Sequence, residues 1–333
     1  MSDTASRPKR AAAEATAEKI GQSLQAQDID LTAFNEASKG AEQSADEPSS
    51  AKKKAKKAPL ADPHNVSNTL DAETSARIIE RLEARGKDEV FRSLFKGFFP
   101  QLFGCLNVLE IGCGTGVVLR ELIKDPAFKG KATGMDQSAC FVDAARRLAT
   151  EEGLPAERLS FTEADAHHLP SGKYDAVVLN TLISHVTDPT AVLAQAAAVA
   201  APGAVLIVMD GDYGSLTYAN PKDAALGREM DRSFVTAVYA QPDAMRELAE
   251  RLPAAGWRLE CVKSQCLSEV GGHAEASFWV SYAKAYMPRV VQAGYVSQKR
   301  VDSWWSSQQQ ALAEGHFFAA CVYYTFIAKR GER

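Results

Sequence analysis

A glycine-rich segment between two apolar runs constrains the fold of this chain more than any other feature. The segment is Val108-Leu109-Glu110-Ile111-Gly112-Cys113-Gly114-Thr115-Gly116, and an apolar-periodic run from Val117 to Leu122 follows it. This pattern predicts a buried strand, a tight loop and the first turns of a helix. Glycine lets the backbone approach a ligand closely, and the N-terminus of a helix offers free N–H groups to a polar or anionic group. The segment therefore predicts a ligand site.

The glycine spacing and two acids further along the chain narrow the choice of ligand. The loop has the spacing Gly-x-Gly-x-Gly, not the Gly-x-Gly-x-x-Gly of dinucleotide sites. Asp136 ends a second predicted strand about 20 residues past Gly116, where an acid can accept from both hydroxyls of a ribose. Asp165 follows a third predicted strand, where it can face an adenine amino group. A glycine loop alone also suits a plain strand–helix turn, but together with these acids it favours a nucleoside site.

Strand and helix patterns alternate through the middle of the chain. Strands are predicted over residues 108–111, 132–136, 159–163, 174–179 and 204–209, and helices over 117–125, 138–152 and from 189 to 201. This alternation predicts an α/β fold with a doubly wound parallel sheet. Ligands of such sheets bind beyond the carboxyl ends of the strands. The segments Asn180–His185 and Asp210–Tyr213 are therefore expected to lie beside the glycine loop, at the carboxyl edge of the sheet.

The glycine loop and the two acids, in this order, resemble the class I S-adenosylmethionine-dependent methyltransferases. Glu-Ile-Gly-Cys-Gly-Thr-Gly resembles the first motif of that family, Asp136 its ribose-binding acid and Asp165-Ala166 its adenine-contacting pair. The resemblance covers roughly residues 91–330 and is greatest to small-molecule enzymes of the ubiquinone/menaquinone-biosynthesis type. It implies S-adenosylmethionine as the cofactor. The residues that it assigns to cofactor binding are Glu110, Gly112, Cys113, Gly114, Gly116, Asp136, Gln137, Asp165, Ala166 and Asn180.

The resemblance also implies a seven-stranded, mostly parallel sheet with helical cap insertions. The apolar segment 317–328 is similar to the antiparallel last strand of the family, which lies between strands five and six. Helical cap insertions are expected at about 213–241 and 270–315, with helices over 274–286 and 297–314 in the second. An amphipathic helix over 88–102 precedes the glycine loop, and its aromatic stripe is expected to pack on the sheet. Phe91, Arg92 and Phe95 are the residues of this helix that could contact the cofactor.

Three residues on the substrate side are candidates for catalysis. His185 is a candidate general base, although a structural histidine bonded to the backbone is the alternative. Asp212 and Tyr213 belong to the segment Asp210–Tyr218, where a carboxylate can bind a cationic amine or accept a proton. Asp-Gly is also a common turn, so this segment has a second interpretation. No group of residues has the spacing of a metal site, and we predict no metal.

Residues 1–62 differ in composition from the methyltransferase domain predicted over 63–333. They are rich in Ala, Ser, Lys and Glu and contain one aromatic residue, Phe34, which predicts disorder. The lysine run 52–57 suits a nuclear-import signal, an RNA-binding patch or a solvated tail. The net charge of −4 argues against a stable nucleic-acid partner. We expect a cytoplasmic protein with reduced cysteines and no membrane span, and the sequence does not indicate the oligomeric state.

These observations predict an enzyme that moves a methyl group by in-line displacement to an O, N or S atom of a small-molecule metabolite. Three alternatives stay open. The first is a protein or RNA methyltransferase that docks through the Lys-rich arm, and the second is a cofactor-binding module without catalysis. The third is a hydride-transfer enzyme, which the glycine spacing disfavours.

Overall fold

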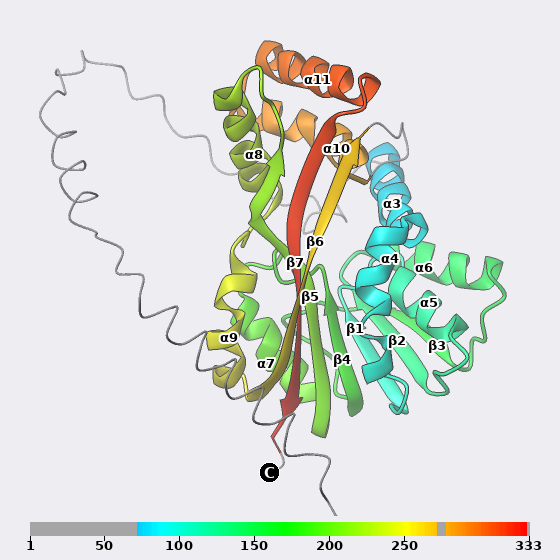
Figure 1. The fold of residues 1–333 in the computed structure, drawn as a ribbon. Helices are drawn as coiled ribbons and strands as arrows, with labels where there is room; N and C mark the ends of the chain where they lie inside the picture. The colour runs from blue at the N-terminus through cyan, green and yellow to red at the C-terminus, as the bar shows by residue number, and fades with distance from the viewer. Residues whose placement is uncertain (1–71, 272–277, 332–333) are drawn as a thin grey trace, which may run out of the picture. The chain divides into compact units, whose positions relative to one another are not determined.

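The computed structural model describes residues 72–271 and 278–331 (Figure 1). The predictions for the arm at 1–62 and for its lysine run lie outside the described residues.

A seven-stranded sheet with the order β3-β2-β1-β4-β5-β7-β6 runs through the described part of the chain. The strands are β1 Asn107–Ile111, β2 Lys131–Asp136, β3 Leu159–Glu163, β4 Tyr174–Asn180, β5 Ala200–Tyr218, β6 Trp257–Gly271 and β7 Phe317–Arg330. Strands β1 to β5 are parallel to their neighbours, whereas β7 is antiparallel to both β5 and β6. The predicted doubly wound sheet, with its last strand between the fifth and the sixth, is confirmed. Its strand order reverses between β1 and β4, which is where such sheets bind ligands.

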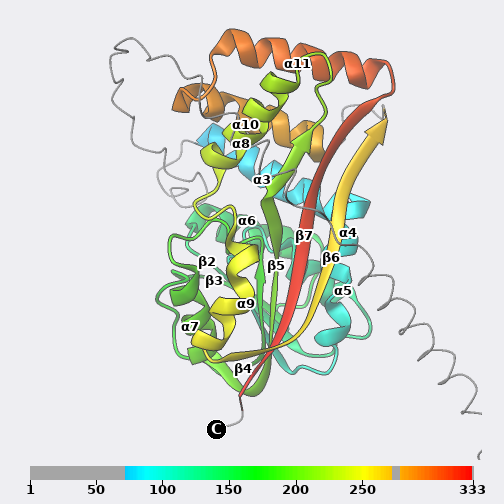
Figure 2. The same cartoon turned by 60° about the vertical axis from the view of Figure 1, so that its left-hand side comes forward.

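Helices cover both faces of the sheet. In Figures 1 and 2, α7 Pro189–Val199 and α9 Ala244–Ala254 lie on one face, and α4 Glu89–Lys96, α5 Val117–Lys124 and α6 Ala139–Glu151 lie on the other. Successive strand residues point to opposite faces, so Val177 of β4 belongs to the apolar cluster under α7 and α9, and Val178 to the other cluster. Burial on both faces explains why the strands of the sheet centre are apolar throughout.

Strand β5 continues from Met209 to Tyr218, beyond the edge at which the neighbouring β4 ends. It stays paired with β7, apart from an irregularity between Asp212 and Thr217. The helices α8 Ala224–Val238, α10 Phe278–Ala293 and α11 Gln298–Ala313 gather at this extension (Figures 1 and 2). Their shared core is aromatic and almost fully buried, and includes Phe234, Trp279, Tyr282 and Trp304. These helices are the helical insertions expected from the sequence.

Two local predictions are wrong. The helix predicted over 88–102 ends at Lys96, and a short 3-10 turn, η2 Phe99–Gln101, follows it. Pro100 explains the early end, because it lacks the backbone N–H that an α-helix continuing past Lys96 would need to bond the carbonyl of that residue. The turn considered at Asp210-Gly211 is also wrong, because both residues lie in β5 and pair with Tyr324 and Tyr323 of β7.

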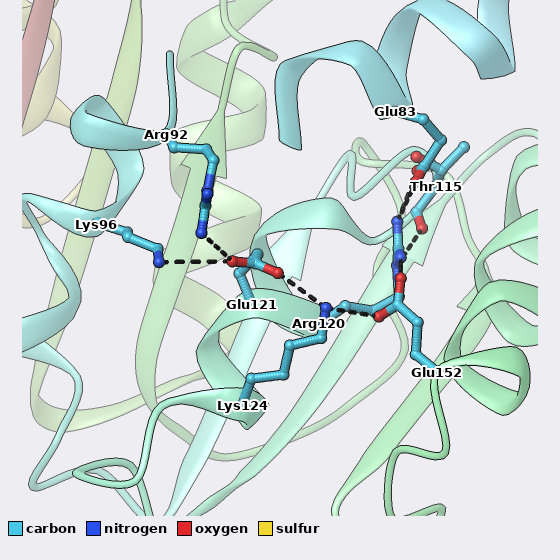
Figure 3. Close-up of polar contacts among 8 residues, drawn as sticks. All are labelled: Glu83, Arg92, Lys96, Thr115, Arg120, Glu121, Lys124 and Glu152. Carbon is cyan, nitrogen blue, oxygen red and sulfur yellow. Dashed lines mark hydrogen bonds and ion pairs between the residues drawn. The ribbon is translucent and has the colours of Figure 1, made fainter. Parts of the chain in front are cut away.

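Buried Arg120 joins α3 Ala72–Lys87 to the glycine loop (Figure 3). Its Nη2 lies 2.6 Å from Oε1 of Glu83 in α3, its Nη1 bonds Glu152 at the end of α6, and its Nε donates to the carbonyl of Thr115 at 3.3 Å. A second group of charges surrounds Glu121 of α5, which pairs with Arg92 and Lys96 of α4 and with Lys124. The network fixes α3 and α4 against α5 and the loop.

Replacing Arg120 with methionine should destabilise the protein. The substitution removes the cation that pairs with Glu83 and leaves Glu152 with Lys124 alone. Because both acids are partly exposed, we expect a loss of about 2 kcal/mol, below the range for a fully buried pair. Urea unfolding of the full chain measures this loss. Arg147→Met is the matched control, because Arg147 forms an exposed pair with Glu151 and should cost less than about 0.5 kcal/mol. Equal effects of the two substitutions would contradict the role of Arg120.

Asp231 of α8 should make stability depend on pH. Its carboxylate accepts from the backbone N–H of Tyr218 at 3.0 Å and from the hydroxyl of Thr217 at 3.3 Å, and burial raises its pKa from 3.8 to about 7. The folded state therefore binds this proton more tightly than the unfolded chain, so its contribution to stability is lost as the pH rises toward about 7.

We expect the melting temperature of the parent to fall relative to Asp231→Asn between pH 5 and pH 8, values that lie on either side of that pKa. Thermal unfolding across this range is the measurement. Asp302→Asn, which changes an exposed carboxylate of α11, is the control. The difference in melting temperature between the parent and this variant should stay constant across the same pH range. A pH-independent gap between parent and Asp231→Asn would show that the Asp231 carboxyl does not titrate there.

Candidate active site

A cavity lies at the carboxyl ends of β1, β2 and β4, where the strand order reverses. Helices α3 and α4 and the glycine loop complete its walls. The lining residues are Leu82, Arg85, Phe91, Phe95, Glu110, Gly112, Cys113, Gly114, Thr115, Val117, Val118, Asp136, Gln137, Phe141, Ala164, Asp165, Ala166, His167, Asn180, Thr181, Leu182, His185 and Val186. All the predicted cofactor residues except Gly116 line this cavity, so the structure brings them together.

The glycine loop takes a backbone conformation and a packing that side chains would disturb. Gly112 has a φ of +71°, and a Cβ there would lie 2.7 Å from Leu182. Gly116 has a φ of +74° at the start of α5, and a Cβ there would lie 2.4 Å from the ring of Phe161. Gly112 therefore lets the loop lie against the segment after β4, whereas Gly116 serves the packing of α5 and does not line the cavity.

Two acids lie under the loop. The carboxylate of Asp136 accepts from the backbone N–H of Gly114 at 2.8 Å and from that of Ser138 at 2.9 Å. Burial raises the pKa of Asp136, although these two hydrogen bonds lower it in part. Glu110 is 1% exposed, and burial, followed by the nearby charge of Asp136, raises its pKa well above the usual value. The site thus places a strongly desolvated carboxyl next to the predicted ribose acid.

Asp165 lies at the other end of the cavity with two histidines around it. Its Oδ1 accepts from the backbone N–H of His167 at 2.9 Å, and its two oxygens lie 3.1 and 3.0 Å from Nδ1 of His167 and His168. The hydrogen bond from the backbone of His167 is the largest of the effects that lower the pKa of Asp165 to about 2. This carboxylate is therefore ionised over the whole physiological range. Of the two histidines, His167 lines the cavity.

Buried polar atoms without partners test whether the predicted cofactor fits. Oε2 of Glu110, Oδ1 of Asn180 and Oγ1 of Thr115 are buried and have no hydrogen-bond partner among the described residues. Such atoms are costly unless a ligand or water satisfies them. S-adenosylmethionine carries an ammonium group and two ribose hydroxyls that donate hydrogen bonds, so the acceptors present suit it.

The three predicted catalytic residues do not all reach the cavity. His185 lines it and is 5% exposed. Asp212 instead points to α9, where its Oδ1 lies 2.9 Å from Nε of Arg246. Tyr213 is buried with its ring stacked on that of Tyr239, at 3.5 Å between centroids. Neither Asp212 nor Tyr213 is among the lining residues, so their catalytic roles stay predictions that this arrangement does not favour.

Helix α3 contributes residues to the cavity that were not predicted from the sequence. Leu82 and Arg85 line the cavity, and Nη1 of Arg85 donates to the hydroxyl of Thr181 at 2.8 Å. Thr181 has a positive φ of 51°, which is uncommon for a residue other than glycine. The available signal was a pair of arginines, Arg81 and Arg85, at the spacing that places two side chains on one face of a helix.

The described ranges show neither a metal cluster nor a membrane-spanning helix. Within 72–271 and 278–331, no three His, Cys, Asp or Glu side chains gather in a way that would ligate a metal ion. None of the helices described there combines the length and the apolar character needed to cross a bilayer.

Comparisons with known proteins indicate a methyltransferase domain. Residues 109–206 match a family described as "Methyltransferase domain". An uncharacterized 37.1 kDa protein in transposon TN4556 of Streptomyces fradiae is 31% identical over 67% of this chain and 62% of its own length. The ubiquinone biosynthesis O-methyltransferase of Pectobacterium atrosepticum is 35% identical over 31% of this chain and 41% of its own length. The norajmaline N-methyltransferase of Rauvolfia serpentina is 33% identical over 33% and 38%. The chain thus spans less than two thirds of each of these relatives.

Removing the Asp136 carboxylate should weaken binding of S-adenosylhomocysteine, the demethylated form of the predicted cofactor. Asp136→Ala deletes the group that we assign to the ribose hydroxyls, and the loss should be about 1–3 kcal/mol, the scale of hydrogen bonds to a charged group. Isothermal titration calorimetry measures the affinity.

Asp175→Ala is the matched control for this substitution. The Asp175 carboxylate also accepts from two backbone N–H groups, those of Leu106 and Asn107, but at the opposite end of β1. It should cost stability and leave the affinity for S-adenosylhomocysteine unchanged. If Asp136→Ala also left the affinity unchanged, the ribose assignment would be wrong.

Proposed function

Because the chain carries a methyltransferase domain of the class I, S-adenosylmethionine-dependent type, we propose that it transfers a methyl group to an O, N or S atom of a small-molecule acceptor. One observation carries the proposal: the cavity at the strand switch point contains the buried acceptor atoms Glu110 Oε2 and Asn180 Oδ1 without partners among the described residues, beside the acid at the end of β2. An ammonium-bearing nucleoside supplies donors for these acceptors.

Each part of the cavity has a separate binding role in this proposal. Asp136 receives the ribose hydroxyls, and Asp165 with Ala166 receives the adenine. Glu110 and Asn180 accept from the amino-acid end, and the backbone of Gly112 to Gly114 allows close approach. The cofactor supplies a methyl group on a sulfonium, so the protein does not need to activate that carbon. The protein must position the acceptor in line with the methyl group, which is worth several kcal/mol through avoided entropy loss (roughly 7 kcal/mol or more in well-oriented model reactions).

The walls on the α3 and α4 side exclude water. Leu82, Phe91 and Phe95 line the cavity there, and both phenylalanines are at most 1% exposed. His185 lies on the same cavity, in the segment after β4, and serves as the general base if the acceptor atom is protonated. Burial raises the pKa of the neighbouring Asp210, while its electrostatic interaction with His185 lowers it. A His185 imidazolium, the form reached once the base has accepted a proton, thus favours the ionised form of this buried carboxyl.

Two features support a small-molecule acceptor. Two of the relatives are named for methyl transfer, one in ubiquinone biosynthesis and one to norajmaline. The cap helices α8, α10 and α11 enclose an aromatic core above the long strands, which suits a compact acceptor. A macromolecular substrate held by the Lys-rich arm is the alternative, and we propose a cytoplasmic enzyme without a stable nucleic-acid partner.

The test is methyl transfer by the full chain. Purified protein is incubated with S-adenosylmethionine labelled in the methyl group and with metabolite extracts from which macromolecules have been removed. We expect label in a low-molecular-mass product, and loss of that product in Asp136→Ala but not in Asp175→Ala. Labelling that appears only when protein or RNA is added back would favour the alternative acceptor. Failure to bind the cofactor at all would reject the proposed function.

A further inference from the structure

Two arginines on α3 face the interior of the protein. Arg85 is 8% exposed, and its Cζ lies 5.2 Å from the ring centre of Phe91. Arg81, one helical turn earlier, stacks on Tyr286 and Tyr282 of α10 with its Cζ 4.1 and 5.0 Å from their ring centres. Nε of each arginine is buried without a hydrogen-bond partner among the described residues. A guanidinium stacked on a ring keeps its N–H edge available for an acceptor in its plane.

Neither charge is neutralised within the described part of the chain. In residues 72–271 and 278–331 no carboxylate lies within ion-pair distance of Arg81 or Arg85. Desolvation, and then the charge of Arg85, lowers the pKa of Arg81. Charges inside a protein are normally paired, because an isolated one is costly to desolvate. Two neighbouring cations without a counter-charge among the described residues therefore point to an anion that binds beside them.

The tyrosines around the arginines do not supply that negative charge. Burial is the main cause that raises the pKa values of Tyr213, Tyr239, Tyr282 and Tyr323 above the usual value. All four phenols therefore stay protonated and act as hydrogen-bond donors. The hydroxyl of Tyr282 is buried, and its interaction with Tyr239 lowers the pKa of Tyr282 in part. Neutral donors beside two cations form an environment that suits an anionic acceptor group.

The aromatic rings connect this cluster to the proposed active-site cavity. His185, which lines the cavity, lies 5.1 Å from Tyr239, and Tyr239 stacks on Tyr213. Tyr213 in turn contacts Tyr323, and Tyr323 lies 5.9 Å from Phe91, which lines the cavity again. The rings thus form a path of contacts from the cavity to the cap. Arg85 lines the cavity, whereas Arg81 and Tyr282 lie behind it and are not among its lining residues.

We propose that Arg81 and Arg85, with the hydroxyl of Tyr282, bind the carboxylate of an aromatic acceptor molecule. This inference rests on the proposed function, because it names the class of molecule that the same enzyme methylates. A planar guanidinium edge matches the two oxygens of a carboxylate, and the surrounding rings match a flat body. The carboxylate is held apart from the atom that is methylated, so its binding free energy orients the acceptor.

The experiment compares carboxylic acids with uncharged molecules of the same shape. The probes are a set of hydroxybenzoates and naphthoates, each matched by its amide, and inorganic phosphate serves as a control for general anion effects. Binding to the full chain saturated with S-adenosylhomocysteine is followed by thermal shift and calorimetry. In the parent we expect at least one acid to bind about tenfold or more tightly than its amide, as charge-assisted pairing predicts, and phosphate alone to have little effect.

Variants identify the groups responsible. Arg81→Met and Arg85→Met should reduce the preference for the acid to about threefold or less, and Arg81→Lys should keep only part of it because lysine lacks the planar fork. Tyr282→Phe should weaken acid binding. Because the hydroxyl that it removes also interacts with Tyr239, urea unfolding of this variant separates a loss of binding from a loss of stability. Arg147→Met, which changes an exposed arginine of α6, should retain the full preference.

The outcomes separate this inference from the proposed function. If acids and amides bind alike across the whole set, the carboxylate site is wrong and the proposed function stands. The same conclusion follows if Arg81→Met weakens the binding of S-adenosylhomocysteine but not the binding of the acid. If the parent does not bind S-adenosylhomocysteine, the proposed function itself fails. Unchanged acid preference in Tyr282→Phe together with both arginine variants would also overturn the site.

Discussion

The bond between the Asp136 carboxylate and the backbone of Gly114 is the interaction on which the rest of the site depends. It joins the end of β2 to the loop after β1, and the backbone N–H of Ser138 holds the second oxygen of the same carboxylate. Because Asp136 is buried, these bonds form in a region of low effective dielectric, where they are strong and where their loss is costly. They fix the loop while leaving Glu110 and Asn180 free to accept from a ligand.

The charges of α3 are divided between its two sides, and this division explains how the helix tolerates unpaired arginines. On its outer side Glu83 pairs with buried Arg120, which also holds the carbonyl of Thr115 (Figure 3). On its inner side Arg81 and Arg85 face aromatic rings without a carboxylate among the described residues. The favourable pairing on one side offsets the desolvation on the other. The side chain of Arg120 consequently couples α3 to the glycine loop that forms a wall of the cavity.

The sequence revealed the parts of the site that depend on short segments. Strand–glycine–helix patterns and acids at strand ends are local, so the loop, Asp136 and Asp165 could be assigned from the order of residues alone. The extension of β5 could not be assigned, because Asp210-Gly211 is extended only through its pairing with Tyr323 and Tyr324, more than a hundred residues away. The arginine–tyrosine cluster was missed for the same reason. Its members come from α3, β5, β7, α10 and the segment after α8, and no spacing in the chain links them.

The separation of the two halves of the cavity has a chemical consequence. In the proposed function, the half formed by the glycine loop and the strand ends binds the nucleoside through elements common to many doubly wound sheets, whereas the half beside the cap is built from insertions. Binding free energy gained at a group distant from the reacting atom can be used to orient that atom, and such energy raises turnover only when the geometry holds the reacting atoms in line. A charge anchored by two arginines at the cap side suits this purpose. In this proposal, the specificity of the enzyme resides in α3 and the cap, and the chemistry resides in the strand ends that could be predicted from the sequence.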